Sequence, residues 1–192
     1  MPLKAIVKVS HISNLSDARY CAGMGVEMLG FRVVPGGGQY MPPEIFQDIR
    51  GWIAGPKIVA ELYGVSSLQQ LQYALGTYSP DYVELGWDEY KAFGQGLSLP
   101  CIVYAKTGTE AQSLQKTESM GYLLLDEHVS CRDISSIRIP TLLKIGTLQI
   151  LQEKQREGCF KGYALEGPDE IRPGITNYDR LGAILEALEE EN

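Results

Sequence analysis

The chain has 192 residues, of which 44% are hydrophobic and 21% are charged, as is ordinary for one globular domain. Its formal net charge of −7 argues against a nucleic-acid partner, because phosphate binding needs a basic face. No apolar run approaches the length of a membrane span, and the N-terminus lacks the layout of a signal peptide. We therefore expect a cytoplasmic protein without a membrane partner.

The four cysteines are Cys21, Cys101, Cys131 and Cys159. None of them forms a C-x-x-C pair, and the chain has only two histidines, so no spacing of zinc ligands is present. We expect four reduced, mostly buried thiols. Neither a metal nor a cofactor is predicted.

Short apolar runs rich in β-branched residues alternate with segments of helical periodicity along the whole chain. The predicted strands are residues 5–9, 28–34, 57–62, 82–85, 101–104, 122–126, 142–145 and 162–165. Helix signals fall between them. Capping boxes begin at Ser66 and Thr107, Pro43 suits a first helical position, and Thr147 opens a segment that stops at Gly158.

Eight strands alternating with helices predict either a closed parallel barrel or an open doubly wound sheet. A (β/α)8 TIM barrel ordinarily has about 250 residues, and about 200 is the usual lower end, so this one would be compact. The stretch between Asp126 and Thr141 is too short for a full helix with its loops. We expect a single domain over residues 1–192, with a shortened or missing helix after the sixth strand.

Several segments occur in the order typical of one known family. The most specific are Lys-Val-Ser-His-Ile-Ser-Asn at 8–14, Asp-Ala at 17–18, Ala-Gly-Met-Gly at 22–25 and Leu-Gly-Phe at 29–31. Weaker matches follow at 39–44, 83–86, 123–126 and 173–175. Together they resemble phosphoribosylanthranilate isomerase and favour the barrel over the open sheet. The resemblance implies an Amadori rearrangement of N-(5'-phosphoribosyl)anthranilate, a step of tryptophan biosynthesis.

Such a rearrangement needs an acid at the ring oxygen and a base at the C2 proton, on opposite sides of one cleft. The resemblance places the acid at Asp126, which has a structural alternative as the cap of the next turn. The base of the family is a cysteine, and Ser10 stands at that position. A serine needs an activating neighbour, and the adjacent His11 is a candidate substitute base. In a regular strand, however, His11 would point away from Ser10 and pack on the rim or under the first helix.

The residues expected to bind substrate also depart from the family pattern. The family's substrate-binding arginine is Gln39 here, and residues 127–130 stand where the family has a glycine-rich stretch. Gly146, Thr147 and Gly167 are the candidates for what remains of a phosphate cradle, which needs small residues that expose backbone N–H groups. Gly36 to Gly38 are interpreted as a loop over the cleft, either a lid or a simple connection.

A second constellation follows from the barrel, since charged residues fall near several strand ends. They are Glu61, Glu84, Asp126 and Glu166, with Lys106, Lys144, His11 and His128 nearby. Glu84 and Lys144 are the candidates for substrate contacts, and Lys144 has a second interpretation as a Schiff-base lysine. The group as a whole is either a set of mutually satisfied ion pairs, a ligand site, or an oxygen-lined metal site.

Three functions are consistent with these features, because a fold alone does not specify a reaction. The first is a divergent phosphoribosylanthranilate isomerase. The second is a barrel enzyme that acts on another small anionic metabolite, and the third is a non-catalytic barrel that binds a metabolite. Each predicts a small-molecule partner, with a sugar phosphate favoured, and a monomer or homodimer.

Overall fold

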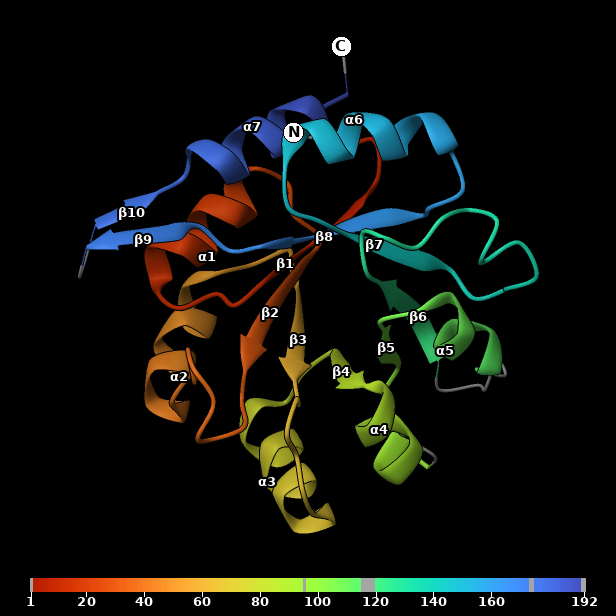
Figure 1. The fold of residues 1–192 in the computed structure, drawn as a ribbon. Coiled ribbons are helices and arrows are strands. Elements are labelled where there is room, and N and C mark those ends of the chain that lie inside the picture. The colour runs from red at the N-terminus through yellow and green to blue at the C-terminus, as the bar shows by residue number, and fades with distance from the viewer. Residues whose placement is uncertain (1, 95, 115–119, 173–174, 191–192) are drawn as a thin grey trace.

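A closed barrel of eight parallel strands forms the centre of the molecule (Figure 1). The computed structural model describes residues 2–94, 96–114, 120–172 and 175–190. The strands are β1 (Ile6–Ser10), β2 (Met28–Arg32), β3 (Lys57–Glu61), β4 (Tyr82–Gly86), β5 (Cys101–Ala105), β6 (Met120–Leu125), β7 (Thr141–Ile145) and β8 (Gly162–Glu166). Pairing of β1 with β8, from Ile6 opposite Gly162 to Ser10 opposite Glu166, closes the barrel. The TIM-barrel prediction is confirmed.

Helices follow most strands and surround the barrel (Figure 1). They are α1 (Leu15–Gly23), α2 (Pro43–Trp52), α3 (Leu68–Tyr78), α4 (Trp87–Glu89) with a π-helical turn at Tyr90–Gly94, α5 (Gly108–Ser113), α6 (Leu148–Glu157) and α7 (Asp179–Ala187). Turns and irregular backbone connect β6 to β7 over residues 126–140, as the length of that segment predicts. Among the described helices, none has the length and apolarity that a membrane crossing needs.

The predicted helix starts are largely confirmed by the caps. Thr107 accepts a hydrogen bond from the Glu110 backbone, Thr147 accepts one from Ile150, and Gly158 ends α6 in a left-handed conformation with φ of 69°. The box predicted to begin at Ser66 begins one residue later, at Ser67. The sequence contains two overlapping Ser-x-x-Gln patterns, and in the second of them Ser67 accepts the capping hydrogen bond from Gln70 N.

One element was not predicted. After β8 the chain forms an antiparallel hairpin, β9 (Asp169–Arg172) and β10 (Ile175–Asn177), which projects from the barrel beside α1 and α7 (Figure 1). Its strands are short, with β9 exposed and β10 partly exposed, so they lack the apolar runs from which strands were predicted. Of the Pro-Gly-Ile match at 173–175, the first two residues lie outside the described part of the chain.

Inward-facing positions alternate along the strands and change character toward their C-terminal ends. A layer of apolar side chains fills the barrel interior: Met28, Val59, Ile102, Leu124, Leu142 and Ala164. Two positions further along five of these strands, the inward residues are Glu61, Tyr104, Asp126, Lys144 and Glu166. The barrel therefore presents a polar mouth at the end where enzymes of this fold carry their active sites.

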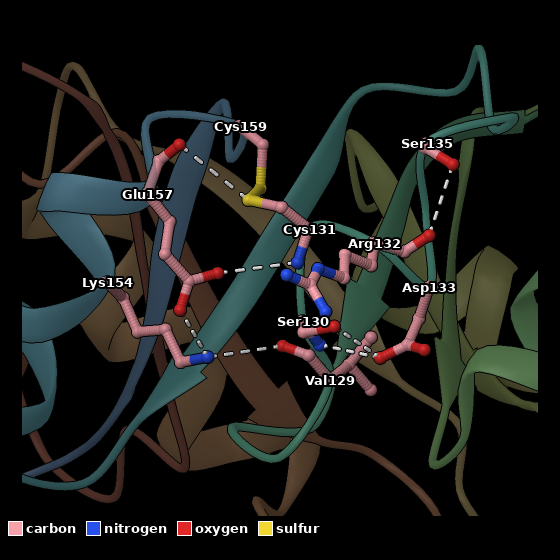
Figure 2. The surroundings of a disulfide bond; sticks show 9 residues. All are labelled: Val129, Ser130, Cys131, Arg132, Asp133, Ser135, Lys154, Glu157 and Cys159. Carbon is pink, nitrogen blue, oxygen red and sulfur yellow. Dashed lines mark hydrogen bonds and ion pairs between the residues drawn. A yellow bond between two sulfur atoms is a disulfide. The ribbon is translucent and has the colours of Figure 1, made fainter.

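Two of the four cysteines are joined, contrary to the expectation of four free thiols. Cys131 and Cys159 form a disulfide that ties the β6–β7 segment to the turn after α6 (Figure 2). A separation of 28 residues in sequence gave no sign of this contact, which depends on how the irregular segment folds back. Cys21 and Cys101 are outside the disulfide and buried, as predicted. Burial, with Asp17 nearby, raises the pKa of Cys21 to about 12.

Candidate active site at the barrel mouth

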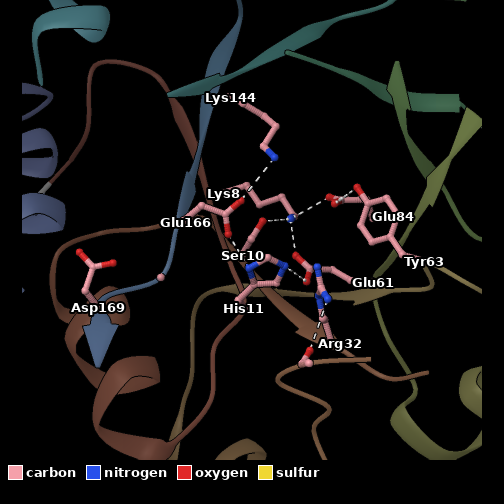
Figure 3. A network of polar contacts seen from close by, with 12 residues as sticks. Lys8, Ser10, His11, Arg32, Glu61, Tyr63, Glu84, Lys144, Glu166 and Asp169 are labelled. Carbon is pink, nitrogen blue, oxygen red and sulfur yellow. Dashed lines mark hydrogen bonds and ion pairs between the residues drawn. The ribbon is translucent and has the colours of Figure 1, made fainter. Parts of the chain in front are cut away.

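A fully buried lysine organises the floor of the site (Figure 3). Lys8 Nζ lies 2.7 Å from Glu61 Oε1 and 2.7 Å from Glu84 Oε2. It also donates to Ser10 Oγ at 2.6 Å. Tyr63 completes the arrangement by donating its hydroxyl to Glu84 Oε1 at 2.6 Å. Two carboxylates from neighbouring strands thus share one ammonium group inside the barrel.

Gly30 provides the space for this arrangement. A Cβ atom at position 30 would lie 2.2 Å from Glu61 Oε1 and 3.0 Å from Lys8 Nζ. Any larger residue at position 30 would therefore displace the Lys8–Glu61 ion pair. The glycine of the Leu-Gly-Phe motif therefore has a packing function at the site.

The charges of this cluster depend on one another. Burial alone lowers the pKa of Lys8, but the charges of Glu61 and Glu84 outweigh it and hold that pKa above its ordinary value. Burial raises the pKa of Glu84, and the negative charge of the neighbouring Glu61 also raises it. For Glu61 the effect of burial is opposed by Lys8 and His11, which lower its pKa. Lys8 is therefore an ammonium ion at neutral pH and cannot serve as a base toward Ser10.

His11 lies in the mouth beside Ser10, and the placement on the rim or under the first helix is wrong. Its backbone has φ of 57°, which is left-handed and turns the side chain away from the regular strand alternation. Nδ1 pairs with Glu166 Oε2, and Nε2 lies 3.6 Å from Glu61 Oε2 (Figure 3). Since 3.6 Å exceeds a hydrogen-bond distance, Glu166 is the carboxylate that orients the ring.

Glu166 also links His11 to Lys144. The Lys144 ammonium lies 3.4 Å from Glu166 Oε1 and 5.2 Å from the centre of the Tyr104 ring. Partial burial opposes ionisation of Glu166, but its contacts with His11 and Lys144 prevail and lower its pKa to about 2. Glu166 is therefore a permanent anion near neutrality that fixes two basic groups.

Asp126 follows β6 at the mouth, and its carboxylate accepts a hydrogen bond from Tyr104 Oη at 2.8 Å. His128 Nε2 lies 3.7 Å from its other oxygen. The turn that follows is closed by the backbone carbonyl of Asp126, which accepts from Val129 N at 3.0 Å. The Asp126 side chain is thus directed to Tyr104 and His128. Burial of Tyr104 and its hydrogen bond to Asp126 raise the pKa of Tyr104.

Three adjoining hollows make up the mouth. The central cavity, of about 260 Å³, is lined by Ser10, His11, Arg32, Tyr63, Glu84, Tyr104, Leu124, Lys144 and Glu166. A hollow of about 350 Å³ borders it at Lys144 and Glu166 and includes Asp126 and Gly146. A third, of about 270 Å³, borders it at Tyr63 and Tyr104 and includes Lys106. Ser10 and His11 therefore line one cavity, and Asp126 lines the next.

The remaining candidates for substrate binding occupy different places. Gln39 is exposed on the loop after β2 and lines none of these hollows. The Thr147 hydroxyl caps α6. The Gly167 N–H donates to the Ser10 carbonyl at 2.9 Å, so it is already bound. Of the three residues proposed for a phosphate cradle, Gly146 alone borders a hollow at the mouth.

Four residues of the site were not predicted: Lys8, Arg32, Tyr63 and Tyr104. Strand alternation carries the missing signal, since Lys8 shares a face with Ser10, and Arg32 shares one with Gly30. Tyr104 likewise shares a face with Ile102. Tyr63 lies just beyond β3, where the two-residue alternation of strand side chains no longer predicts the direction of a side chain.

The mouth carboxylates are bound to basic groups or hydroxyls, which supports the ion-pair interpretation of the second constellation. Among the described residues, the one cluster of three candidate metal ligands is Cys131, Glu157 and Cys159, away from the mouth. The two sulfur atoms there are joined to each other, and Glu157 pairs with Lys154 at 2.8 Å (Figure 2).

The fold and the mouth define the class of protein: a (β/α)8 barrel with a polar site of ionisable side chains at the C-terminal ends of its strands. No family model matches the sequence, and no curated protein does. Solved structures that match over nearly the whole chain are phosphoribosylanthranilate isomerases, so the resemblance seen in the sequence is confirmed in the fold.

The enzyme from Thermus thermophilus is 18% identical, with a TM-score of 0.75, and the match covers 95% of this chain and 98% of that one. The enzyme from Thermotoga maritima gives 15% and 0.76, with 95% and 97% covered. A third structure holds reduced 1-(o-carboxyphenylamino)-1-deoxyribulose 5-phosphate; it is 16% identical, with a TM-score of 0.74 and coverage of 95% and 97%. At these identities the shared property is the fold, and the chemistry must be argued from the site.

Proposed function

We propose that this chain is an acid–base isomerase that performs an Amadori-type rearrangement on a small sugar-derived substrate, with His11 as the base. The observation that carries the proposal is the left-handed backbone of His11, which places the imidazole in the central cavity against Glu166. An imidazole that is oriented by a carboxylate through one nitrogen can exchange a proton at the other. In this mechanism Nε2, which lies 3.6 Å from Glu61 Oε2, is the nitrogen that accepts the substrate proton.

The proton donor in this mechanism is Asp126, held by Tyr104. Protonation of the ring oxygen opens the sugar to an imine, and removal of the C2 proton by His11 then gives the enolamine that becomes the ketone. The ring oxygen and C2 are both bonded to C1, so the acid and the base must approach this carbon from two sides, Asp126 from one hollow and His11 from the adjoining cavity. Ser10, which is bound to Lys8, contributes a polar wall and no proton transfer.

The test is turnover of N-(5'-phosphoribosyl)anthranilate by protein produced in a host that lacks its own isomerase, followed by the loss of anthranilate fluorescence. We expect His11→Gln and Asp126→Asn to lower kcat by about 10²–10⁴, as is typical when an acid–base group is lost. Ser10→Ala retains most of the activity. Circular dichroism of each variant establishes that it is folded. Wild-type turnover no greater than that of Asp126→Asn rejects this reaction, and a loss confined to Ser10→Ala rejects His11 as the base.

A second candidate is the same proton transfer on a substrate without a phosphate group. It is favoured by the Gly167 N–H, which is already bound, and by the Thr147 hydroxyl, which accepts from Ile150 N to cap α6. The carboxylates of Asp126 and Glu127 beside Gly146 also disfavour a phosphate there. Inorganic phosphate distinguishes the two. Competitive inhibition by millimolar phosphate supports a phosphorylated substrate, and its absence supports the second candidate.

A further inference from the structure

Arg32 is a charged residue of the central cavity that the proposed reaction does not use. It ends β2, opposite Glu61 in the strand register, and its side chain lines the cavity (Figure 3). Its Nε is buried and has no hydrogen-bond partner within the described residues. A buried donor without an acceptor is unfavourable, so this nitrogen is suited to receive one from a ligand.

The other charges of the cavity are already paired. Glu84 holds Lys8, and Glu166 holds both His11 and Lys144. In the described part of the chain, the recorded partner of the Arg32 guanidinium is the neutral carbonyl of Gly38, at 3.3 Å from Nη1. Within the described residues, the Arg32 guanidinium therefore has a neutral partner and no carboxylate at ion-pair distance.

Arg32 also anchors the glycine-rich loop. Its carbonyl accepts a hydrogen bond from Met41 N at 2.8 Å, and it forms a bridge with Tyr40, so the loop returns to the strand end where it began. With Nη1 directed to Gly38, the guanidinium keeps its Nε edge for another partner. That edge presents two parallel N–H groups, which match the two oxygens of a carboxylate.

We propose that Arg32 is a specificity-determining residue that binds a carboxylate group of the substrate in the central cavity. The inference rests on the proposed function, because it names the substrate class of the same site. A planar carboxylate fits the Nε edge and brings one negative charge, whereas a phosphate dianion would bring two beside Glu84 and Glu166. Arg32 thereby supplies, from the end of β2, the cation that Gln39 does not provide.

The experiment is a two-dimensional NMR titration of the full chain with anthranilate, with anthranilamide as the neutral isostere and inorganic phosphate as the competing anion. We expect the wild type to bind anthranilate at least about tenfold more tightly than anthranilamide, as a charge-assisted fork provides. Arg32→Gln removes that preference, and Arg32→Lys, which keeps the charge without the fork, retains part of it. Arg50→Gln, a matched change at an exposed position of α2, retains all of it.

The same spectra report whether each variant is folded. The proposal is overturned if Arg32→Gln binds anthranilate as the wild type does, if the wild type does not prefer the carboxylate, or if phosphate binds more tightly in an Arg32-dependent manner. His11→Gln separates this inference from the proposed reaction, since it should lose turnover and keep its affinity for anthranilate. Carboxylate binding without turnover would support Arg32 and reject the isomerase.

Discussion

At the residue scale, Lys8 shows how the site depends on compensation between buried charges. An ammonium group with no exposed surface is unfavourable by itself, and so are the two carboxylates that face it. Each is tolerated because the others are present. Removal of one member alone therefore destabilises the fold, because it leaves a buried charge without its partner.

We expect Lys8→Met to lower the free energy of unfolding by about 3–5 kcal/mol, because it leaves Glu61 and Glu84 buried without a cation. The triple variant with Glu61→Gln and Glu84→Gln should recover part of that loss. Lys57→Met, at an exposed pair with Asp81, should cost no more than about 1 kcal/mol. Urea unfolding measures all three, and equal losses for Lys8→Met and Lys57→Met would contradict the account.

The pH dependence of stability should identify Glu166. Its pKa is lowered to about 2 from an ordinary value of 4.5, so it stabilises the folded state above 4.5 and loses that effect as the pH falls toward 2. Glu166→Gln should therefore have a lower Tm than the wild type at pH 7, with a difference that shrinks below pH 4.5. Exposed Glu153→Gln is the control. A difference that stays constant across this range would refute the assignment.

At the element scale, closure of the barrel depends on how closely β8 approaches β1. A Cβ atom at Gly162 would lie 2.2 Å from the carbonyl oxygen of Ile6. At the other end of the same pair, a Cβ at Gly167 would lie 3.0 Å from the Ser10 carbonyl. Both glycines therefore serve the last pairing of the barrel, which also holds Ser10 and His11 in place.

Gly162→Ala should lower the free energy of unfolding by about 1–3 kcal/mol or more, because it forces β8 away from β1. The matched change Gly76→Ala meets no atom within 4 Å and lies inside α3, where alanine is preferred, so it should stabilise by about 0.5–1 kcal/mol. Chemical denaturation of both variants tests the pair. Similar effects of the two substitutions would show that space at the β1–β8 seam is not limiting.

At the scale of the whole molecule, the disulfide replaces part of the constraint that a helix after β6 would supply. It connects the segment that follows Asp126 to the turn that leads into β8, the strand that ends at Glu166 (Figure 2). The disulfide therefore links two segments adjacent to residues of the site. Lys154 adds a hydrogen bond to the Val129 carbonyl at 3.4 Å in the same region.

Reduction of the oxidised protein should lower the free energy of unfolding by about 3–4 kcal/mol, from the chain entropy of a 28-residue separation. The double variant Cys131→Ser with Cys159→Ser should be as stable as the reduced wild type and insensitive to reductant. Thiol titration of the unfolded, oxidised protein should find two free groups, Cys21 and Cys101. Four free groups would show that the disulfide does not form in solution.

The sequence by itself determined a fold of eight strands alternating with helices, and the resemblance of its motifs to phosphoribosylanthranilate isomerase favoured the barrel over an open sheet. It also placed Ser10, Asp126, Lys144 and Glu166 near strand ends, since strand boundaries follow from local composition. These features depend on residues that are close together in the chain, where period and turn chemistry apply.

Only the tertiary structure decided which of those residues meet. The left-handed backbone of His11, the lysine shared by Glu61 and Glu84, and the Cys131–Cys159 disulfide all depend on contacts between distant segments. Local patterns carry no record of such contacts, because the free energy that selects them arises from burial and charge pairing after the barrel has closed. The position of His11 in the central cavity, the Arg32 guanidinium without a carboxylate partner and the bound N–H of Gly167 were therefore visible only in the folded chain.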